Sequence, residues 1–226
     1  MDTEKFARVR SLIFDLDGTL IDSQQDLILS VKAMLREAGR PDLPYEIISG
    51  YIGHGAPRLV SRALGENASA EELQHALTFF LSYYEAHKLD NTCAYPGVAA
   101  TLEKLSSLPM AVLTNKPVNI SVRILDALGL SKYFRFIYGG NSFESKKPDP
   151  FGANKILSAF AISPAETLFV GDSDVDIQTA RNAGTLAAIA NYGFGVYDSA
   201  ANPADISIGE FRELANIVQE VKLPST

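Results

Sequence analysis

The stretch Ser11-Leu-Ile-Phe-Asp-Leu-Asp-Gly-Thr19 decides the fold class of this chain of 226 residues. Its first four residues form a short apolar run, which ends in a carboxylate and is soon followed by a glycine. Such runs are typical of strands in a parallel sheet that is covered on both faces. Because side chains alternate along a strand, Asp15 and Asp17 are expected to point the same way while Leu16 faces the core.

Four more short apolar runs follow, and segments with the three- and four-residue spacing of amphipathic helices lie between them. This alternation predicts an α/β fold, a doubly wound parallel sheet with helices on both faces. The runs cover residues 109–114, 136–138, 167–172 and 185–190, and the helical segments cover residues 98–105, 118–128, 150–160 and 175–183.

The segment between the first strand and the rest of the sheet is different, because it contains no convincing strand. Apolar positions predict three helices, around residues 27–35, 59–64 and 73–84. An insert of about 70 residues is too long to be a loop and needs a small core of its own. We therefore expect an α/β core of residues 1–21 and 92–226 and a helical cap of residues 22–91, with hinges near both junctions.

Composition narrows the class of protein further. Twenty Lys and Arg against 27 Asp and Glu give a net charge of -7, which disfavours binding to nucleic acid. No apolar run reaches the roughly 20 residues that a membrane helix needs. The single cysteine, Cys93, cannot form an internal disulfide and is expected to be a small buried side chain. We expect a cytoplasmic protein, a monomer or homodimer, with neither nucleic acid nor membrane as partner.

Three of the predicted strands end in a chemically reactive residue: Asp15, Thr114 and Asp172. Ligands of open α/β sheets bind at the carboxyl ends of the strands, so these side chains are expected to meet. Asp176 lies four residues after Asp172 and would face the same site from the first turn of a helix. Helix capping would also explain the acidic pair, as it would explain Thr114. Lys147 adds a cation just before a helix, although a lone lysine is most often a surface charge.

The oxygen ligands in this set favour a hard cation, and a site that keeps several waters suits Mg²⁺. Such an ion pairs naturally with a phosphate. Four segments together also resemble, in order, the four motifs of the haloacid dehalogenase-like hydrolases, whose core is Rossmann-like and whose type I cap is inserted after the first motif. Those segments are Asp15-Leu-Asp-Gly-Thr-Leu20, Thr114-Asn115, Lys147-Pro-Asp-Pro150 and Gly171-Asp-Ser-Asp-Val-Asp176. Two further segments, Tyr51-Ile-Gly-His-Gly-Ala-Pro57 and Tyr95-Pro-Gly97, resemble the phosphoglycolate phosphatase subfamily.

The resemblance implies a role for each matching residue. Asp15 would be the nucleophile that forms an aspartyl-phosphate, and Asp17 the general acid and base. Thr114 and Lys147 would hold the transferring phosphoryl group, and Asn115 would help to bind substrate. The implied ligands of Mg²⁺ are Asp15, the main-chain carbonyl of Asp17 and Asp172. Asp176 would bind the ion directly or through water, or would only orient other groups.

Within the insert, the segment Gly53-His54-Gly55 is expected either to close over the site or to be a plain glycine-rich turn. In the first case His54 or Arg58 would lie near the distal group of the substrate. Arg58 and Arg62 are one helical turn apart and suit a substrate carboxylate, but they are equally ordinary surface arginines.

The resulting hypothesis is a Mg²⁺-dependent phosphomonoester hydrolase for a small phosphorylated metabolite, with 2-phosphoglycolate as the first candidate. Pyrophosphatase, nucleotide or sugar-phosphate phosphatase and phosphomutase activities share the same chemistry. An alternative of another class is a receiver-like phospho-switch, which also combines an acidic pocket with a Thr and a Lys. The acid at Asp17 and the long insert argue for turnover of a small substrate instead.

Overall fold

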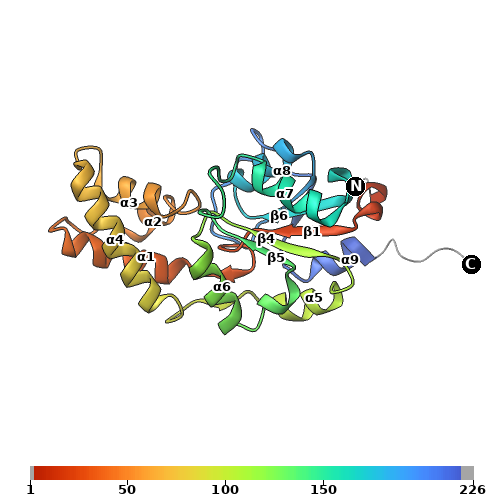
Figure 1. Cartoon of the computed structure of the whole chain (residues 1–226), viewed down its shortest axis with the longest axis horizontal. Helices are drawn as coiled ribbons and strands as arrows, with labels where there is room; N and C mark the ends of the chain where they lie inside the picture. Colours follow the sequence, from red (N-terminus) through yellow and green to blue (C-terminus); the bar gives the residue numbers. More distant parts are fainter. Residues whose placement is uncertain (1–2, 220–226) are drawn as a thin grey trace, which may run out of the picture.

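The computed structural model describes residues 3–219 and contains a six-stranded sheet in which every strand pair is parallel (Figure 1). This confirms the predicted fold class, a doubly wound α/β sheet. In spatial order the strands are β5 (Phe136–Tyr138), β4 (Met110–Leu113), β1 (Ser11–Phe14), β6 (Thr167–Gly171), β7 (Leu186–Ala190) and β8 (Ile206–Ile208).

Strand β1 lies in the middle of the sheet, between β4 and β6, and all four of its residues are buried. Its last residue, Phe14, is in register with Val112 of β4 and Val170 of β6. The three strands therefore end at nearly the same level, and the residues that follow them meet at one edge of the sheet. This register is what brings the first, second and fourth sequence motifs together.

Helices cover both faces of the sheet, as the alternation along the sequence predicts. Leu12 and Phe14 of β1 pack into the cluster that contains residues of α5, α6 and α9, whereas Ile13 packs into the cluster that contains residues of α7 and α8 (Figure 1). The bounds are α5 (Val98–Lys104), α6 (Val118–Ala127), α7 (Phe151–Phe160), α8 (Asp174–Ala183) and α9 (Glu213–Gln219), with short 3-10 helices at Thr3–Arg8, Ser131–Tyr133 and Pro164–Glu166.

The insert is helical and lies beyond the carboxyl edge of the sheet, on the left of Figure 1. Its buried faces pack against one another, with Ile28, Val31 and Leu35 of α1 in the same apolar cluster as Phe80 and Tyr84 of α4. The linkers to the core pair as a two-stranded antiparallel ribbon, β2 (Ile21–Asp22) and β3 (Cys93–Ala94). The helices are α1 (Gln24–Glu37), α2 (Tyr45–Ser49), α3 (Ala56–Leu64) and α4 (Ala70–His87).

Some local expectations differ from the structure. Helices α2 and α9 and strand β8 were not predicted, and each is at most seven residues long. The prediction that Cys93 is buried is wrong, because it lies in the linker ribbon, opposite Asp22, and is exposed. A two-stranded linker has no second layer to cover it, whereas the sheet strands are covered on both sides.

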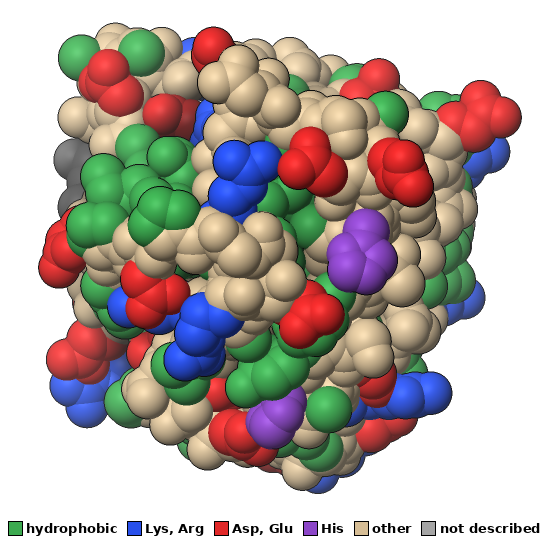
Figure 2. Space-filling view, turned by 90° about the vertical axis from the view of Figure 1, so that its left-hand side faces the viewer, with side chains coloured by type: hydrophobic (Ala, Val, Ile, Leu, Met, Phe, Trp, Pro, Cys, Tyr) green, Lys and Arg blue, Asp and Glu red, His purple; other side chains and the backbone are tan. Residues whose placement is uncertain are grey.

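The end of the helical insert that faces away from the sheet carries acidic and basic side chains interspersed with apolar ones (Figure 2). Neither sign gathers into a continuous area on that face. Among the helices within residues 3–219, none combines the length and the apolar character that crossing a bilayer would require.

Candidate active site

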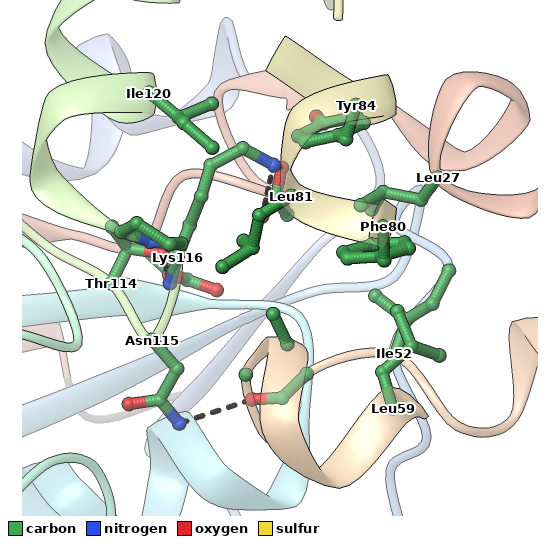
Figure 3. Close-up of a pocket in the computed structure, with 16 residues that line it drawn as sticks. Leu27, Ile52, Leu59, Phe80, Leu81, Tyr84, Thr114, Asn115, Lys116 and Ile120 are labelled. Atoms are coloured by element: carbon green, nitrogen blue, oxygen red, sulfur yellow. Dashed lines mark hydrogen bonds and ion pairs between the residues drawn. The ribbon is translucent and has the colours of Figure 1, made fainter. Parts of the chain in front are cut away.

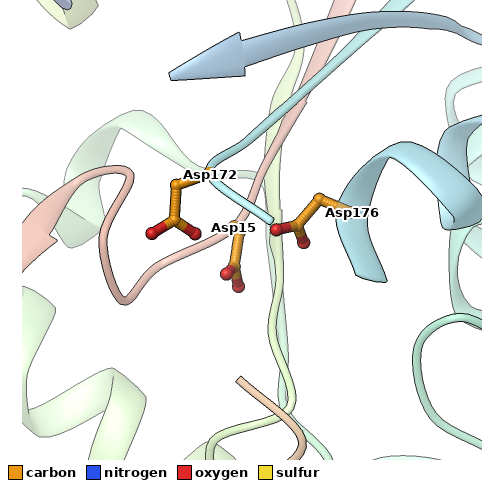
Figure 4. Close-up of side chains that lie close together, drawn as sticks. All are labelled: Asp15, Asp172 and Asp176. Carbon is orange, nitrogen blue, oxygen red and sulfur yellow. The ribbon is translucent and has the colours of Figure 1, made fainter. Parts of the chain in front are cut away.

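Three buried carboxylates lie together at the carboxyl edge of the sheet. Asp15 follows β1, Asp172 follows β6, and Asp176 projects from the first turn of α8 (Figure 4). Each offers a carboxylate oxygen within 4.8 Å of the other two. Residues that are more than 150 positions apart in the sequence thus form one acidic cluster, which would be unstable without compensating positive charge.

Lys147 supplies part of that charge from the segment before α7. Its Nζ lies 2.7 Å from Oδ1 of Asp15 and 2.6 Å from Oδ1 of Asp176. Burial by itself would lower the pKa of Lys147, but the two carboxylates outweigh this and raise it, so the side chain stays charged. Lys147 is therefore part of the site and not a surface charge, whereas its neighbour Lys146 is exposed.

The environment of Asp15 disfavours its charged form. Burial raises the pKa of Asp15 from 3.8 to about 7, the ion pair with Lys147 opposes the rise, and the nearby charge of Asp176 adds to it. Burial likewise raises the pKa of Asp172, and the neighbouring carboxylates increase the shift. Both shifts have the same largest cause, the burial of the carboxylate away from water, which disfavours its charged form.

The loop after β7 and a glycine of the first motif enclose Asp172. Its Oδ2 accepts hydrogen bonds from the backbone N–H groups of Gly195 at 2.7 Å and Phe194 at 3.1 Å. A Cβ at Gly18 would lie 1.8 Å from the same oxygen, and Gly18 has a φ of +80°, which few other residues adopt. The glycine is thus required both by its conformation and by its contact with Asp172.

This donor set fits a hard divalent cation. Asp15 and Asp172 present carboxylate oxygens at the centre of the cluster. Asp176 is already engaged on both oxygens, since Oδ1 pairs with Lys147 and Oδ2 accepts from the N–H and hydroxyl of Ser173. Its contacts suit a residue that orients Lys147 and the loop, which was one of the roles expected from the sequence.

The end of β4 contributes two predicted residues, Thr114 and Asn115, and both are buried. The Thr114 hydroxyl accepts a hydrogen bond from the backbone N–H of Lys116 at 3.2 Å. This bond does not cap α6, whose N-cap is Pro117 and which has no side-chain cap. The Asn115 side chain donates to the carbonyls of Gly53 and Lys147, each at 3.1 Å. Asn115 therefore joins the insert to the core, and this contact holds the loop at Gly53 over the site.

Asp17 has a partner that the sequence did not reveal. The Nζ of Lys116 lies 2.7 and 2.9 Å from the two carboxylate oxygens of Asp17, and the hydroxyl of Ser23 donates to Oδ1 at 2.5 Å. Lys116 is 5% exposed. The only sequence signal for it was its position directly after Thr114 and Asn115, where strand register places it at the same edge of the sheet.

A cavity lies between the sheet edge and the insert (Figure 3). It encloses about 40 Å³, which is room for a few water molecules or a ligand of few heavy atoms. Asp15 and Asp17 are among the residues that line it. From the insert it is lined by Leu27, Ile52, Gly53, Gly55, Ala56, Leu59, Phe80, Leu81 and Tyr84, and from the core by Thr114, Asn115, Lys116, Pro117 and Ile120.

The two insert residues proposed from the sequence, His54 and Arg58, are not among the residues that line this cavity. His54 is half-buried, Arg58 is exposed, and the substrate-binding role of both stays a prediction. Burial lowers the pKa of His54, and Arg58, Arg62 and Lys146 lower it further, so four basic side chains share one region beside the loop at Gly53–Gly55.

Comparisons with known proteins agree with this geometry. The model of the haloacid dehalogenase-like hydrolase family matches residues 12–190. A phosphoglycolate phosphatase of Pseudomonas syringae pv. tomato is 38% identical over 213 residues, which cover 90% of this chain and 77% of that protein. A phosphoglycolate phosphatase of Chromobacterium violaceum is 34% identical over 217 residues, which cover 93% of this chain and 97% of that protein.

Among solved structures, that of a predicted phosphoglycolate phosphatase from Haemophilus somnus has a TM-score of 0.88 and 31% sequence identity, over 94% of this chain and 99% of that one. The chain therefore belongs to the haloacid dehalogenase-like hydrolases. Within them it is a phosphatase of the phosphoglycolate phosphatase-like subfamily. The resemblance seen in the motifs is confirmed.

Proposed function

We propose that the chain is a Mg²⁺-dependent phosphomonoester hydrolase whose substrate is a small phosphorylated metabolite, with 2-phosphoglycolate as the first candidate. The observation that carries the proposal is the meeting of Asp15, Lys147 and Asp172 at one sheet edge, where Asp15 also lines a small cavity. The names of the relatives support the choice of 2-phosphoglycolate. The small cavity favours this kind of substrate over a nucleotide.

In the proposed reaction, a carboxylate oxygen of Asp15 attacks phosphorus, and the bond from phosphorus to the ester oxygen breaks. Asp17 gives a proton to the departing alkoxide. Water then attacks the aspartyl-phosphate, Asp17 takes up the proton of that water, and phosphate is released as Asp15 is regenerated. Lys147 keeps Asp15 in place and offsets the charge of the phosphoryl group, and Thr114 offers its hydroxyl to a phosphoryl oxygen.

Asp15, Asp172 and the main-chain carbonyl of Asp17 would hold the Mg²⁺, with Asp176 as the orienting group behind Lys147. The ion would add charge that lets an anionic nucleophile approach an anionic phosphate. Residues 22–91 would act as the cap, which excludes water from the site formed by residues 1–21 and 92–226. The cytoplasmic location and the state as monomer or homodimer stay predictions.

Hydrolysis of an aryl phosphate, followed by release of phosphate from a panel of small phosphate esters, tests the proposal. Asp15→Asn should lower the rate by roughly 10³-fold or more, because the amide is a poor nucleophile. Asp126→Asn, at an exposed helix position of α6, is the matched control and should leave the rate unchanged. Turnover that survives Asp15→Asn, or that proceeds fully in excess chelator, would contradict the mechanism.

A further inference from the structure

Lys116 is a buried cation for which the proposed reaction has no use. Among the described residues that line the cavity it is the one cationic side chain, and it is only 5% exposed. Its charge is held by Asp17, with both carboxylate oxygens within 2.9 Å of Nζ. Burial would lower the pKa of Lys116, but Asp17 outweighs this and raises it, so the side chain carries a full charge at the wall of the cavity.

The insert presents a second unused polar group on the other side of Lys116. Tyr84 of α4 is 2% exposed, and the centroid of its ring lies 4.6 Å from the Nζ of Lys116 (Figure 3). Its hydroxyl is buried and makes no hydrogen bond of good geometry, although the nearby Lys116 interacts with it. A buried hydroxyl whose proton has no acceptor is costly in a folded protein unless a ligand supplies one. Burial raises the pKa of Tyr84 to about 12, so the group is a hydrogen-bond donor near neutral pH.

The remaining walls of the cavity decide what can accept from these donors. Leu59, Phe80 and Leu81 of the insert and Ile120 of α6 offer no polar atoms, so hydroxyl groups of a sugar would stay unpaired there. A planar anion with two oxygens suits one ammonium and one phenol, since each oxygen takes a charge-assisted or neutral hydrogen bond. The cavity has room for only a short group of this kind beyond the phosphate.

We propose that Lys116 and Tyr84 form the subsite that binds a carboxylate on the leaving group of the substrate, and that Lys116 exchanges Asp17 for this carboxylate when substrate enters. The inference rests on the proposed function and adds the residues that select the substrate class, a short phosphorylated carboxylic acid. Neither residue was singled out by the sequence motifs.

The exchange would connect recognition to chemistry. While Lys116 holds both oxygens of Asp17, that side chain cannot turn toward the ester oxygen. A substrate carboxylate releases Asp17, which then keeps only the hydroxyl of Ser23 among its present side-chain partners. A phosphate ester that lacks the carboxylate would leave the pair intact, and it would therefore react slowly as well as bind weakly.

The test compares 2-phosphoglycolate with 2-hydroxyethyl phosphate, which replaces the carboxylate by a neutral hydroxymethyl group. Wild-type kcat/KM should favour 2-phosphoglycolate by roughly 10²-fold or more, with a difference in kcat as well as in KM. Lys116→Met should reduce this preference to less than roughly 10-fold, and Tyr84→Phe, which keeps the ring, should reduce it by roughly 3- to 10-fold. Lys132→Met, at an exposed position, is the matched control and should keep the wild-type preference.

A binding measurement separates selectivity from activity. In the Asp15→Asn background, calorimetry should show that Lys116→Met weakens the binding of 2-phosphoglycolate by roughly 10-fold or more. The affinity for inorganic phosphate should change by less than roughly 3-fold. If both esters are hydrolysed and Lys116→Met keeps the wild-type preference, the subsite is overturned and the phosphatase stands. If wild-type protein hydrolyses no phosphate ester, the proposed function fails. If 2-phosphoglycolate binds equally well to the protein with Lys116 and to the Lys116→Met variant, the subsite is overturned on its own.

Discussion

The two buried lysines of the site differ in what surrounds them. Lys147 lies within the α/β core and pairs with Asp15 and Asp176, which both belong to the carboxylate cluster. Lys116 also comes from the core, but it lies against the insert, where it pairs with Asp17 and faces the ring of Tyr84. Both acidic partners of Lys147 belong to the core, whereas Lys116 also contacts a residue of the insert.

The difference shows which side of the site is the same for every substrate and which side can distinguish one substrate from another. The core side of the site offers the same charges to any phosphate ester, because β1, β4 and β6 fix the positions of their terminal residues. The insert side offers a mostly apolar wall and a single phenol, whose fit depends on the rest of the substrate. Changes at the core should therefore affect all substrates, and changes at the boundary should affect substrates unequally.

The largest effect is expected when the core lysine is removed. Lys147→Met keeps the length of the side chain but leaves Asp15 and Asp176 without their cation, so turnover of every ester should fall by roughly 10²- to 10³-fold. Loss of one partner of a buried ion pair should also destabilise the metal-free fold by about 3–5 kcal/mol. Steady-state kinetics and urea unfolding measure the two effects.

Lys155→Met, at an exposed position of α7, is the control for that change and should alter neither quantity. If Lys147→Met lowered activity toward 2-phosphoglycolate while sparing an aryl phosphate, the contrast between a constant core and a selective boundary would be wrong.

A smaller effect is expected where the insert is attached. Asp26, at the start of α1, is 1% exposed and accepts hydrogen bonds from the backbone and side chains of both Asn91 and Thr92. Asp26→Ala would leave several buried donors unpaired and should lower the free energy of unfolding by about 1–3 kcal/mol. Chemical denaturation should show this, with Asp126→Ala at an exposed site as the control, and an unchanged midpoint would show that Asp26 does not secure the linkers.

The response to pH distinguishes the metal site from the rest of the core. Because the folded protein raises the pKa of Asp15 from 3.8 to about 7, it binds a proton there that the unfolded chain has released. Without a divalent ion, thermal stability should therefore fall as pH rises from about 4 to about 7. Mg²⁺ competes with that proton, so its stabilising effect in thermal melts should be larger near pH 8 than near pH 5. A Mg²⁺ effect independent of pH would place the ion away from Asp15. Asp15→Asn should show a weaker pH dependence than wild type, because Asp172, whose pKa burial also raises, still titrates.

The smallest effect is expected at Arg58, on the outer surface of the insert. It lies with His54, Arg62 and Lys146 beside the loop that covers the site, where a group of cations attracts anions. Arg58→Gln should lower kcat/KM by roughly 2- to 5-fold at low ionic strength and have little effect at high salt. A loss that persists at high salt would instead support direct contact with substrate, as the sequence first suggested.

Much of the core could be predicted because its signals are local. Each of β1, β4 and β6 is an apolar run that is followed by a candidate site residue, and their parallel order follows from the helices between them. The short elements escaped prediction, since α2 has five residues and β8 three, too few for a periodic pattern to appear. Cys93 was misjudged for a similar reason, because burial depends on what packs above a residue and not on its type.

The residues of the site also divide into those that the sequence predicted and those that it did not. Asp15, Thr114, Lys147 and Asp172 were identified from motif and position, and the structure brings them to one edge. Lys116 and its contacts were not foreseen, although it directly follows Thr114 and Asn115. The residues next to Lys116 in the sequence do not indicate that its charge is buried against Tyr84, which lies more than 30 residues earlier in the chain.

By itself the sequence determined the family, the layered α/β sheet and the acidic ends of its strands, because alternating apolar runs and their terminal residues act over a few positions. Only the tertiary structure decided which lysine faces which carboxylate, how closely α4 approaches Lys116 and how little room is left above Asp15. Those distances depend on how the helical insert packs against the edge of the sheet, which is set by contacts between residues far apart in sequence.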